Sequence, residues 1–483
     1  MEDTEQYRKC VITAVLRQSE KNNMGLRGVD VAKPVMISVS GIRGIVGHGL
    51  SPELMVKYSA AAGTFYGGGK VLVGRDSRVT GNMVKHAVFS GLMSVGCNPV
   101  DLGICSTPTV EHAVKVSDAV GGIIITASHN PAEWNALKLL NKDGVFLDEA
   151  AGEELRKIIA GNKAAYKEWD RVGRLASYSN ATTDHIGAIL SMDVIDAELI
   201  RSKKFTVAVD CVNGAGGTVV PRLLESLGCT VHAIHADPTG VFAHTPEPVP
   251  ENLKDLCDAV KESGADIGFA VDPDVDRCAV VDETAKPVGE EYTVVLSAKY
   301  ILEKRKGPVV VNVSTTRAVD DVAREAGVEV FRTKVGEIHV VTKMLDVMAS
   351  VGGEGNGGLI LPDIHLGRDA PMAVAVILQM LAEKGSTISE LAGQVPSYTM
   401  VKKRIEIGGA DPDAVLEMVK NTCDASKLNL VDGVKIEEKN HWVQVRKSNT
   451  EPILRIMAEA ETKERAEAVC DDMMALISKN FQA

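Results

Sequence analysis

The sequence predicts an α/β protein made of three related α/β units with mixed sheets, followed by a smaller α+β unit. Three observations support this. The chain has 483 residues, which is too long for one hydrophobic core and favours several domains. A pattern of strand, helix, glycine and second strand occurs three times along the chain. From about Tyr398 the pattern changes to alternating hydrophobic and polar residues, which is typical of antiparallel strands.

Each repeat begins with an apolar, β-rich run that closes on a polar turn. The three runs are KVLVGRDSR (Lys70–Arg78), FTVAVDCVNG (Phe205–Gly214) and GPVVVNVSTTR (Gly307–Arg317). A stretch compatible with a helix follows each run and ends at a glycine, after which a second strand begins. These glycines are Gly96, Gly228 and Gly327. Strands that alternate with helices indicate βαβ units, mainly parallel sheets and right-handed crossovers.

Each repeat then leads to a distinctive loop. The loops are TASHNP (Thr126–Pro131), which follows the apolar run GGIII, DPDVDR (Asp272–Arg277) and GEGNGG (Gly353–Gly358). Open α/β sheets bind their ligands at the carboxyl ends of strands. We therefore expect the three loops to face one shared cleft, with Ser128 in the first of them.

The remaining segments complete the predicted domain organisation. Two strands, WVQVR and LRIMAEAE, flank Ser448–Pro452, and a closing helix begins at Lys463. The residues before Met36 are polar and without sustained period, so we interpret them as a flexible extension or a misassigned start. The predicted units are 1–35 (extension), 36–182, 183–287, 288–397 and 398–483.

Composition limits the classes of function. Hydrophobic content of 45% and charged content of 24% are ordinary for a globular protein, and the sequence has no apolar run long enough to span a bilayer. A net charge of −12 disfavours binding to nucleic acid or anionic membranes. Nine cysteines, an odd number without a C-x-x-C pair, argue for a reducing cytoplasm. An anionic substrate would need local arginines.

Three alternating carboxylates mark the second loop. Asp272, Asp274 and Asp276 stand too close together to be buried without a cation, and hard oxygen ligands of this kind suit Mg²⁺. The loop lacks the pattern of a calcium-binding EF-hand, because its sixth position is Arg277 rather than glycine. The alternative is a solvated acidic turn, which the very apolar preceding strand disfavours.

The other loops carry groups suited to a sugar phosphate. Glu354 and Asn356 stand among glycines that let a ligand approach the backbone, and an acid with an amide can bind sugar hydroxyls. The stretch RKSNTEPILR (Arg446–Arg455) combines cations, hydroxyls and an amide, as a phosphate monoester requires. In HLGRDA, the residues His365, Arg368 and Asp369 could form an ion pair or contact substrate.

Two tempting readings are set aside. Ser128 beside His129 suggests a hydrolase triad, but adjacent side chains diverge and the G-x-S-x-G elbow is absent. His232 and His235 lie on a strand-like run, where histidines are more often packed or exposed than bound to metal.

TASHNP, DPDVDR, GEGNGG and RKSNTEP occur in the order of the α-D-phosphohexomutase family, one per domain, and the sequence resembles that family over nearly all of 36–483. SGIRG (Ser40–Gly44) resembles the amino-terminal signature of that family. The resemblance implies a four-domain, heart-shaped enzyme with a central cleft. It also implies one Mg²⁺ per active site and a hexose 1,6-bisphosphate as activator and intermediate.

The resemblance also implies roles for individual residues. Ser128 would be the phosphoserine and would bind Mg²⁺ together with Asp272, Asp274 and Asp276. Arg43 and Arg277 would steady the transferring group, and Lys138 resembles a proton-transfer residue. The expected substrate contacts are Glu354, Asn356, His365, Arg368, Arg446, Ser448, Asn449, Thr450 and Arg455.

The substrate is left open between two sugars. Glucose and mannose mutases of the family usually carry a serine in the sugar loop, and many members close it with histidine, where this chain has Asn356 and Gly358. We therefore favour glucosamine 6-phosphate over mannose or glucose phosphate. A metal-dependent sugar phosphatase and a non-catalytic sugar-phosphate-binding protein are alternatives of a different class. We expect a cytoplasmic monomer or homodimer.

Overall fold

Three of the four sheets share one topology. The computed structural model describes residues 35–38, 41–407, 410–447 and 453–481. Sheets of the second and third units have the orders β10-β9-β11-β12 and β14-β13-β15-β16, and the first sheet contains the same motif as β5-β4-β6-β7. In each motif three strands are parallel and the fourth is antiparallel to the third. The repeat predicted from the sequence is confirmed.

The first unit extends this motif into an eight-stranded sheet, because β2 pairs antiparallel with β7. Its elements are β1 (Met36–Ser38), β2 (Gly41–Val46), β3 (Gly49–Leu50), α2 (Pro52–Tyr66), β4 (Gly69–Arg75), α3 (Gly81–Ser94), β5 (Cys97–Ile104), α4 (Thr107–Lys115), β6 (Gly121–Ile125), β7 (Trp134–Leu140), α5 (Glu149–Ala160) and β8 (Ala176–Ser177).

The second and third units each have a four-stranded sheet. The second contains α6 (Ala181–Leu190), α7 (Ala197–Lys203), β9 (Thr206–Asp210), α8 (Val220–Ser226), β10 (Thr230–Ile234), α9 (Lys254–Ser263), β11 (Ile267–Val271) and β12 (Cys278–Val281). The third contains α10 (Glu290–Lys304), β13 (Val309–Asn312), α11 (Ala318–Ala326), β14 (Val330–Thr333), α12 (Glu337–Val347), β15 (Val351–Glu354), β16 (Gly358–Ile360), α13 (Ala370–Lys384) and α14 (Ile388–Ala392).

The fourth unit is an antiparallel sheet of order β17-β21-β20-β19-β18 with helices on one face. It contains β17 (Thr399–Glu406), α15 (Pro412–Asn421), β18 (Leu428–Asn429), β19 (Val434–Glu437), β20 (His441–Lys447), β21 (Ile453–Ala460) and α16 (Lys463–Phe481). The α+β character and the closing helix from Lys463 are therefore confirmed. The exact boundaries between the four units stay a prediction, and the extension before Met36 lies outside the described residues except for Val35.

The three predicted glycines end helices for a common physical reason. Gly96, Gly228 and Gly327 have φ angles of 84°, 74° and 71°. This left-handed conformation costs little only for glycine, and it turns the chain from the helix into the next strand.

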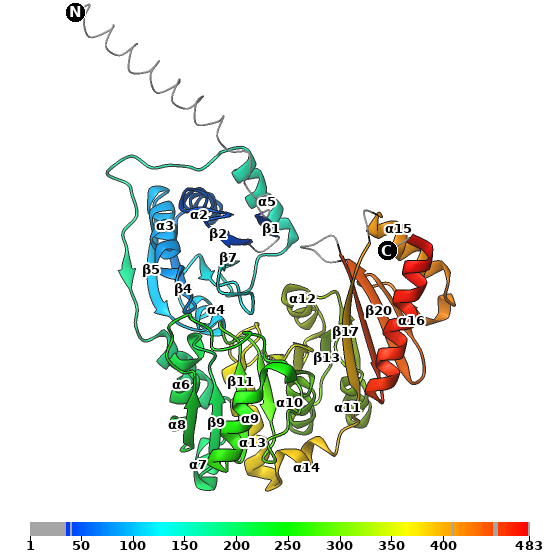
Figure 1. Ribbon diagram of the computed structural model, residues 1–483. Helices are drawn as coiled ribbons and strands as arrows, with labels where there is room; N and C mark the ends of the chain where they lie inside the picture. The colour runs from blue at the N-terminus through cyan, green and yellow to red at the C-terminus, as the bar shows by residue number, and fades with distance from the viewer. Residues whose placement is uncertain (1–34, 39–40, 408–409, 448–452, 482–483) are drawn as a thin grey trace, which may run out of the picture.

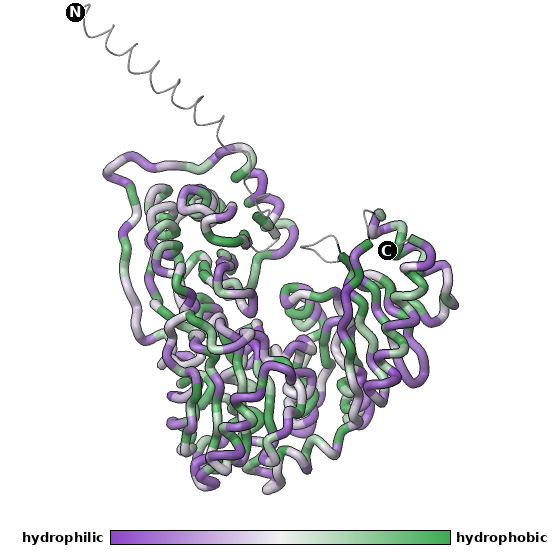
Figure 2. The backbone as a smooth tube through the Cα atoms, in the orientation of Figure 1, coloured by the Kyte–Doolittle hydropathy of each residue, from purple (hydrophilic) through white to green (hydrophobic). Residues whose placement is uncertain are grey.

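The second and third units share one large hydrophobic core. One cluster of buried side chains extends from Ile186 to Val395 and includes α13, whose residues Ala370–Ala382 are all buried. The first and fourth units have cores of their own. In Figure 1 the first and fourth units rise on opposite sides of a base formed by the second and third, which gives the heart shape. Figure 2 shows hydrophobic strands inside this base. None of the described helices has the length and apolar character needed to cross a membrane.

Candidate active site

A cleft of about 450 Å³ collects side chains from all four units. The predicted site residues that line it are Arg43, Ser128, Lys138, Arg277, Glu354, Asn356, Arg368, Arg446 and Arg455. The equivalent loops that join the third and fourth strands of the repeat meet there, as the topology predicts. Each loop contains one residue in the left-handed region: Ser128 (φ 50°), Val275 (φ 64°) and Gly357 (φ 88°).

Ser128 lies at the carboxyl end of β6 and is almost fully buried, with 3% exposure. Its Oγ donates a hydrogen bond to Asp272 Oδ2 at 2.8 Å. Its backbone N–H donates to Thr126 Oγ1 at 2.9 Å, so the loop is fixed on both sides of the serine. A left-handed backbone at a residue with a Cβ is strained and is held here by these contacts.

Our expectation that Ser128 and His129 point apart is wrong. His129 Nδ1 lies 3.3 Å from Ser128 Oγ, because the left-handed φ of Ser128 rotates the two side chains toward each other. Nε2 of His129 lies 4.0 Å from Glu247 Oε1. Nearby Arg277, together with burial, lowers the pKa of His129 well below its usual value, which keeps the ring neutral.

Asp272, Asp274 and Asp276 are all fully buried, and one ligand oxygen from each lies within 4.8 Å of the others. Asp274 Oδ1 and Asp276 Oδ1 have no hydrogen-bond partner, although both are buried. Burial and repulsion from its two neighbours raise the pKa of Asp272 well above its usual value. Unpaired buried oxygens in a cluster of like charge are the arrangement that a divalent cation satisfies.

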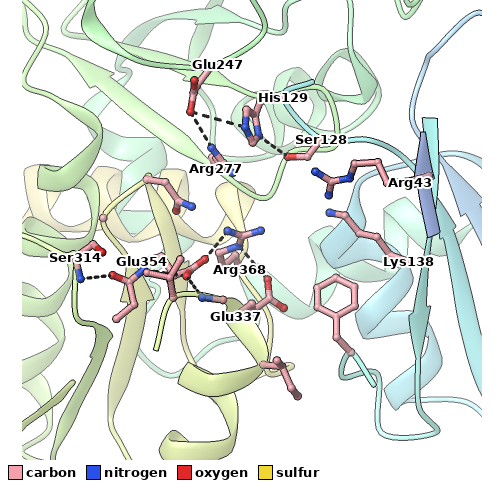
Figure 3. A pocket seen from close by; sticks show the side chains of 18 of the residues that line it. Arg43, Ser128, His129, Lys138, Glu247, Arg277, Ser314, Glu337, Glu354 and Arg368 are labelled. Atoms are coloured by element: carbon pink, nitrogen blue, oxygen red, sulfur yellow. Dashed lines mark hydrogen bonds and ion pairs between the residues drawn. The ribbon is translucent and has the colours of Figure 1, made fainter. Parts of the chain in front are cut away.

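Two cations of the first unit, Arg43 and Lys138, point into the cleft toward Ser128 and Arg368, as Figure 3 shows. Lys138 extends from β7 and places Nζ 2.8 Å from Asp274 Oδ2 and 3.7 Å from Asp276 Oδ2. Arg43 extends from β2 and donates to Asn130 Oδ1 at 2.9 Å. β2 and β7 are neighbours, and Arg43 is opposite Ala136 in their register. The chain thus brings together two residues that are 95 positions apart.

Glu354 is the last residue of β15 and belongs to the third loop, GEGNGG (Gly353–Gly358). Glu354 Oε1 accepts from Asn312 Nδ2 and from the Gly336 backbone N–H, both at 2.9 Å. Its Oε2 accepts from Arg368 Nη1 at 2.6 Å. Burial opposes the charge of Glu354, but Arg368 and these donors lower its pKa below the usual value, so the carboxylate is ionised. Asn356 is partly exposed in the cleft.

Arg368 is a hub of ion pairs rather than a free cation. Its guanidinium contacts Asp276 Oδ2 at 2.6 Å, Glu337 Oε2 at 2.9 Å and Glu354 Oε2 at 2.6 Å. These three carboxylates raise its pKa well above the usual value against the opposing effect of burial. Arg368 therefore connects the carboxylate loop, through Asp276, to the GEGNGG loop, through Glu354.

His365 does not reach the cleft. Its side chain is 0% exposed, and Nε2 lies 2.9 Å from Asp369 Oδ2, which also contacts His185 Nε2 at 2.9 Å. The predicted substrate contact by His365 is not supported by this position. The alternative that we left open, a structural ion pair, describes His365 and Asp369.

Two arginines of the fourth unit face each other across neighbouring strands. Arg446 of β20 and Arg455 of β21 are direct partners in the antiparallel register, and both line the cleft. Arg446 also contacts Asp432 at 3.0 Å. Like charges directly opposite one another destabilise a sheet unless an anion lies between or above them. Ser448, Asn449 and Thr450, predicted for the same role, lie outside the described residues.

Sequence reasoning missed Arg78, which holds the serine loop. Its side chain is fully buried and donates to the backbone carbonyls of Ser128, Asn130, Pro131 and Trp134 at 2.5 to 3.0 Å. The segment KVLVGRDSR predicts only a strand with a polar turn, and nothing in it indicates that Arg78 binds the backbone of Ser128, 50 residues away. Other cleft residues that the sequence did not single out are Glu247, Glu291, Asn312, Ser314, Glu337 and Lys402.

Comparison with protein-family models matches all four units of the chain. The models describe the three alpha/beta/alpha domains (I, II and III) and the C-terminal domain of phosphoglucomutase/phosphomannomutase, and they match residues 36–166, 183–286, 289–398 and 401–476.

Individual relatives cover most of the chain. A protein of Methanopyrus kandleri named "Probable phosphoglucosamine mutase" is 38% identical over 91% of this chain and 97% of its own length. A "Phosphoglucomutase/phosphomannomutase" of Thermococcus kodakarensis is 38% identical over 88% of this chain and 94% of its own length. A crystal structure of a phosphoglucomutase/phosphomannomutase family protein from Burkholderia thailandensis has a TM-score of 0.80 and 26% identity, and covers 92% of this chain and 98% of that one.

Proposed function

Because the chain belongs to the phosphoglucomutase/phosphomannomutase family and is thus a phosphohexomutase, an isomerase, we propose that it interconverts the 6-phosphate and 1-phosphate of glucosamine through phosphorylated Ser128. The observation that carries the proposal is the position of Ser128. Its Oγ lies 2.8 Å from Asp272 in a cleft that also contains the paired arginines of the fourth unit.

The reaction consists of two transfers. In the first, the bond between phosphorus and Oγ of phosphorylated Ser128 breaks while phosphorus bonds to the free sugar hydroxyl; the hydroxyl proton passes to a neutral base in the cleft, and Oγ takes up a proton to become the serine hydroxyl. The resulting hexose 1,6-bisphosphate turns over in the cleft. In the second transfer, the other phosphoryl group returns to Oγ and leaves the isomeric monophosphate. Such transfers need in-line positioning and neutralisation of charge more than covalent chemistry.

The carboxylate loop fits a divalent cation. Asp272, Asp274 and Asp276, with an oxygen on Ser128, would hold one Mg²⁺, and the two unpaired oxygens of Asp274 and Asp276 support this assignment. When bound, the ion would neutralise charge on the transferring phosphoryl group. Arg43 and Arg277, at the edge of the same loop, would bind its remaining oxygens.

Proton transfer at the sugar hydroxyl is assigned to Lys138. As a neutral amine it would accept the hydroxyl proton in the first transfer, and as the resulting ammonium it would return a proton to the sugar oxygen in the second. Its Nζ lies at the mouth of the carboxylate loop with 12% side-chain exposure, within reach of both the cleft and Asp274. Removing water from such a group strengthens its interaction with a charged reaction centre.

Two further groups would bind the substrate away from the reacting phosphate. Glu354 and Asn356 would contact the sugar hydroxyls. Arg446 and Arg455, which both line the cleft, would bind the phosphate that is not reacting through charge-assisted hydrogen bonds. The fourth unit has its own core, so it can move as a body and serve both orientations of the bisphosphate.

The preference for glucosamine rests on Asn356, whose amide both donates and accepts, whereas serine offers only a hydroxyl. Mannose or glucose phosphate is the second candidate. The relative named phosphoglucosamine mutase and the one named phosphoglucomutase/phosphomannomutase are both 38% identical to this chain, so sequence identity does not choose between these sugars.

A sugar phosphatase and a non-catalytic binding protein are the alternatives of a different class. A non-catalytic protein would be expected to lack Ser128 or one aspartate of the loop, and all four are present. The deciding experiment assays the purified protein with Mg²⁺ and a bisphosphate activator on the 6-phosphates of glucosamine, N-acetylglucosamine, glucose and mannose. The proposal predicts the fastest isomerisation for glucosamine phosphate. Release of free phosphate instead of isomer would contradict the mutase assignment. The oligomeric state stays a prediction.

A further inference from the structure

We propose that the second unit binds a divalent transition-metal ion, such as Zn²⁺, at a site separate from the carboxylate loop. The ligands would be Asp210 at the end of β9, His235 directly after β10 and His244 in the loop that leads to α9. Asp255 of α9 contacts His235 from outside this cluster of three.

The distances suit a shared ion. One ligand atom each of Asp210, His235 and His244 lies within 4.8 Å of the others. His244 Nε2 is 2.8 Å from Asp210 Oδ2, and His235 Nε2 is 3.1 Å from Asp255 Oδ2. A tetrahedral ion with bonds of about 2.0–2.2 Å separates its ligands by roughly 3.4 Å. The closer pair would thus open by about half an ångström, which a small side-chain rotation provides.

The two histidines make the site unlike the carboxylate loop. Mg²⁺ prefers oxygen ligands, whereas imidazole nitrogen with carboxylate oxygen suits Zn²⁺. Nδ1 of His244 lies 2.9 Å from the backbone carbonyl of Thr245, so it carries a proton, and Nε2, which donates to Asp210 Oδ2 at 2.8 Å in the absence of an ion, would release its proton on binding one. Oδ1 of Asp210 accepts from the Val212 backbone N–H at 2.9 Å, which leaves Oδ2 for the ion.

The three ligands differ in burial: Asp210 is buried, whereas the two histidines are partly exposed, so an ion could reach the site from solvent. The Asp210 side chain is 1% exposed, whereas those of His244 and His235 are 20% and 28% exposed. The two imidazole rings have centroids 5.8 Å apart and planes at 74°, so both nitrogens can face a common point. An ordinary hydrogen-bonded pair of His244 with Asp210 is the alternative, and it requires no role for His235.

The ion would fix a loop that reaches the active site. The segment between His235 and α9 carries Phe242, whose ring centroid lies 5.1 Å from the guanidinium carbon of Arg78. It also carries Glu247, whose Oε1 is 3.3 Å from Arg277 Nη1. Ligands at the start and the middle of this segment would tie it to β9.

The test measures Zn²⁺ binding by the full-length protein after treatment with chelator. Isothermal titration with Zn²⁺ is performed in excess Mg²⁺, and again in the Asp274→Asn background so that an ion in the carboxylate loop is not counted. The variants are His244→Ala and His235→Gln. The matched control is His232→Ala, because His232 is exposed on β10 and lies outside the cluster.

The proposal predicts one Zn²⁺ per chain for the wild type and for His232→Ala. Either site variant should weaken binding by more than the roughly 10- to 100-fold that loss of an outer-shell partner causes. Zn²⁺ should raise Tm by a few degrees only where it binds. Equal binding by all variants, or none by the wild type, overturns the proposal. If His244→Ala does not fold, the milder His235→Gln carries the same comparison, and unchanged Zn²⁺ affinity there is equally decisive.

Discussion

Replacement of Arg78 by lysine should disable the serine loop while leaving the rest of the cleft intact. Arg78 donates to four carbonyls between Ser128 and Trp134, and its Nε bonds Asp76 Oδ2 at 3.0 Å with both side chains fully buried. Asp76 in turn accepts from Thr126 Oγ1 at 2.7 Å. One guanidinium thus fixes the loop both directly and through Asp76.

The magnitude follows from the number of contacts that lysine cannot replace. An ammonium has three donors and no planar fork, so at least two of the five acceptors lose their partner. Each buried acceptor left without a donor costs about 1–3 kcal/mol, or roughly 2–6 kcal/mol for two. Displacement of a reacting group by about 1 Å lowers the rate by roughly 100-fold. We expect kcat to fall at least about 100-fold, with a smaller change in KM.

The assay combines kinetics with the rate at which a bisphosphate phosphorylates Ser128. Arg305→Lys is the control, because Arg305 pairs with Asp363 through two nitrogens and does not line the cleft. Both variants should lose stability, but only Arg78→Lys should lose phosphorylation of Ser128. Near-normal kcat for Arg78→Lys, or equal losses in both variants, would refute the assigned role.

Three further predictions concern the cleft. Asp274→Asn should keep the fold, weaken Mg²⁺ binding and lower kcat by roughly 10²–10³-fold. Titration calorimetry measures the binding and steady-state kinetics the rate, and full activity of the wild type in excess chelator would count against the metal's role. Arg446→Ala should raise the KM for the monophosphate, and the bisphosphate concentration needed to phosphorylate Ser128, by about 10- to 150-fold each, because a charge-assisted hydrogen bond is worth about 1.5–3 kcal/mol; steady-state kinetics with unchanged values would count against it. Asn356→Ser should shift preference toward glucose and mannose phosphates by roughly ten- to thirtyfold in kcat/KM; an unchanged ratio would exclude Asn356 as a determinant.

The architecture was predictable because its signals are local. Gly96, Gly228 and Gly327 mark helix ends through their backbone conformation, and GGIII before Thr126 reads as a buried strand. The antiparallel extension of the first sheet by β2 was not predicted, since strand order depends on contacts between Gly41–Gly44 and Asn135–Lys138 that no local pattern records.

The candidate site was predictable only in part. The carboxylate loop is visible because like charges alternate within one short segment. His365 was expected to contact substrate but is buried, since a sequence shows the type of a side chain and not its direction. The role of Arg78 could not be predicted, because its partners are backbone carbonyls. Every residue has such a carbonyl, so the sequence does not mark which ones Arg78 binds. The contact between Ser128 and His129 depends on one unusual φ angle.

The most direct test of the central claim, that Ser128 carries the phosphoryl group, is a transfer experiment with dephosphorylated protein. The protein is mixed with hexose 1,6-bisphosphate labelled in its phosphates, and the label is located by peptide mass spectrometry. The account predicts label on Ser128 within one turnover, its transfer to added glucosamine 6-phosphate, and neither event in Ser128→Ala. Isomerisation by Ser128→Ala at a rate near that of the wild type, or label on a different residue, would contradict it.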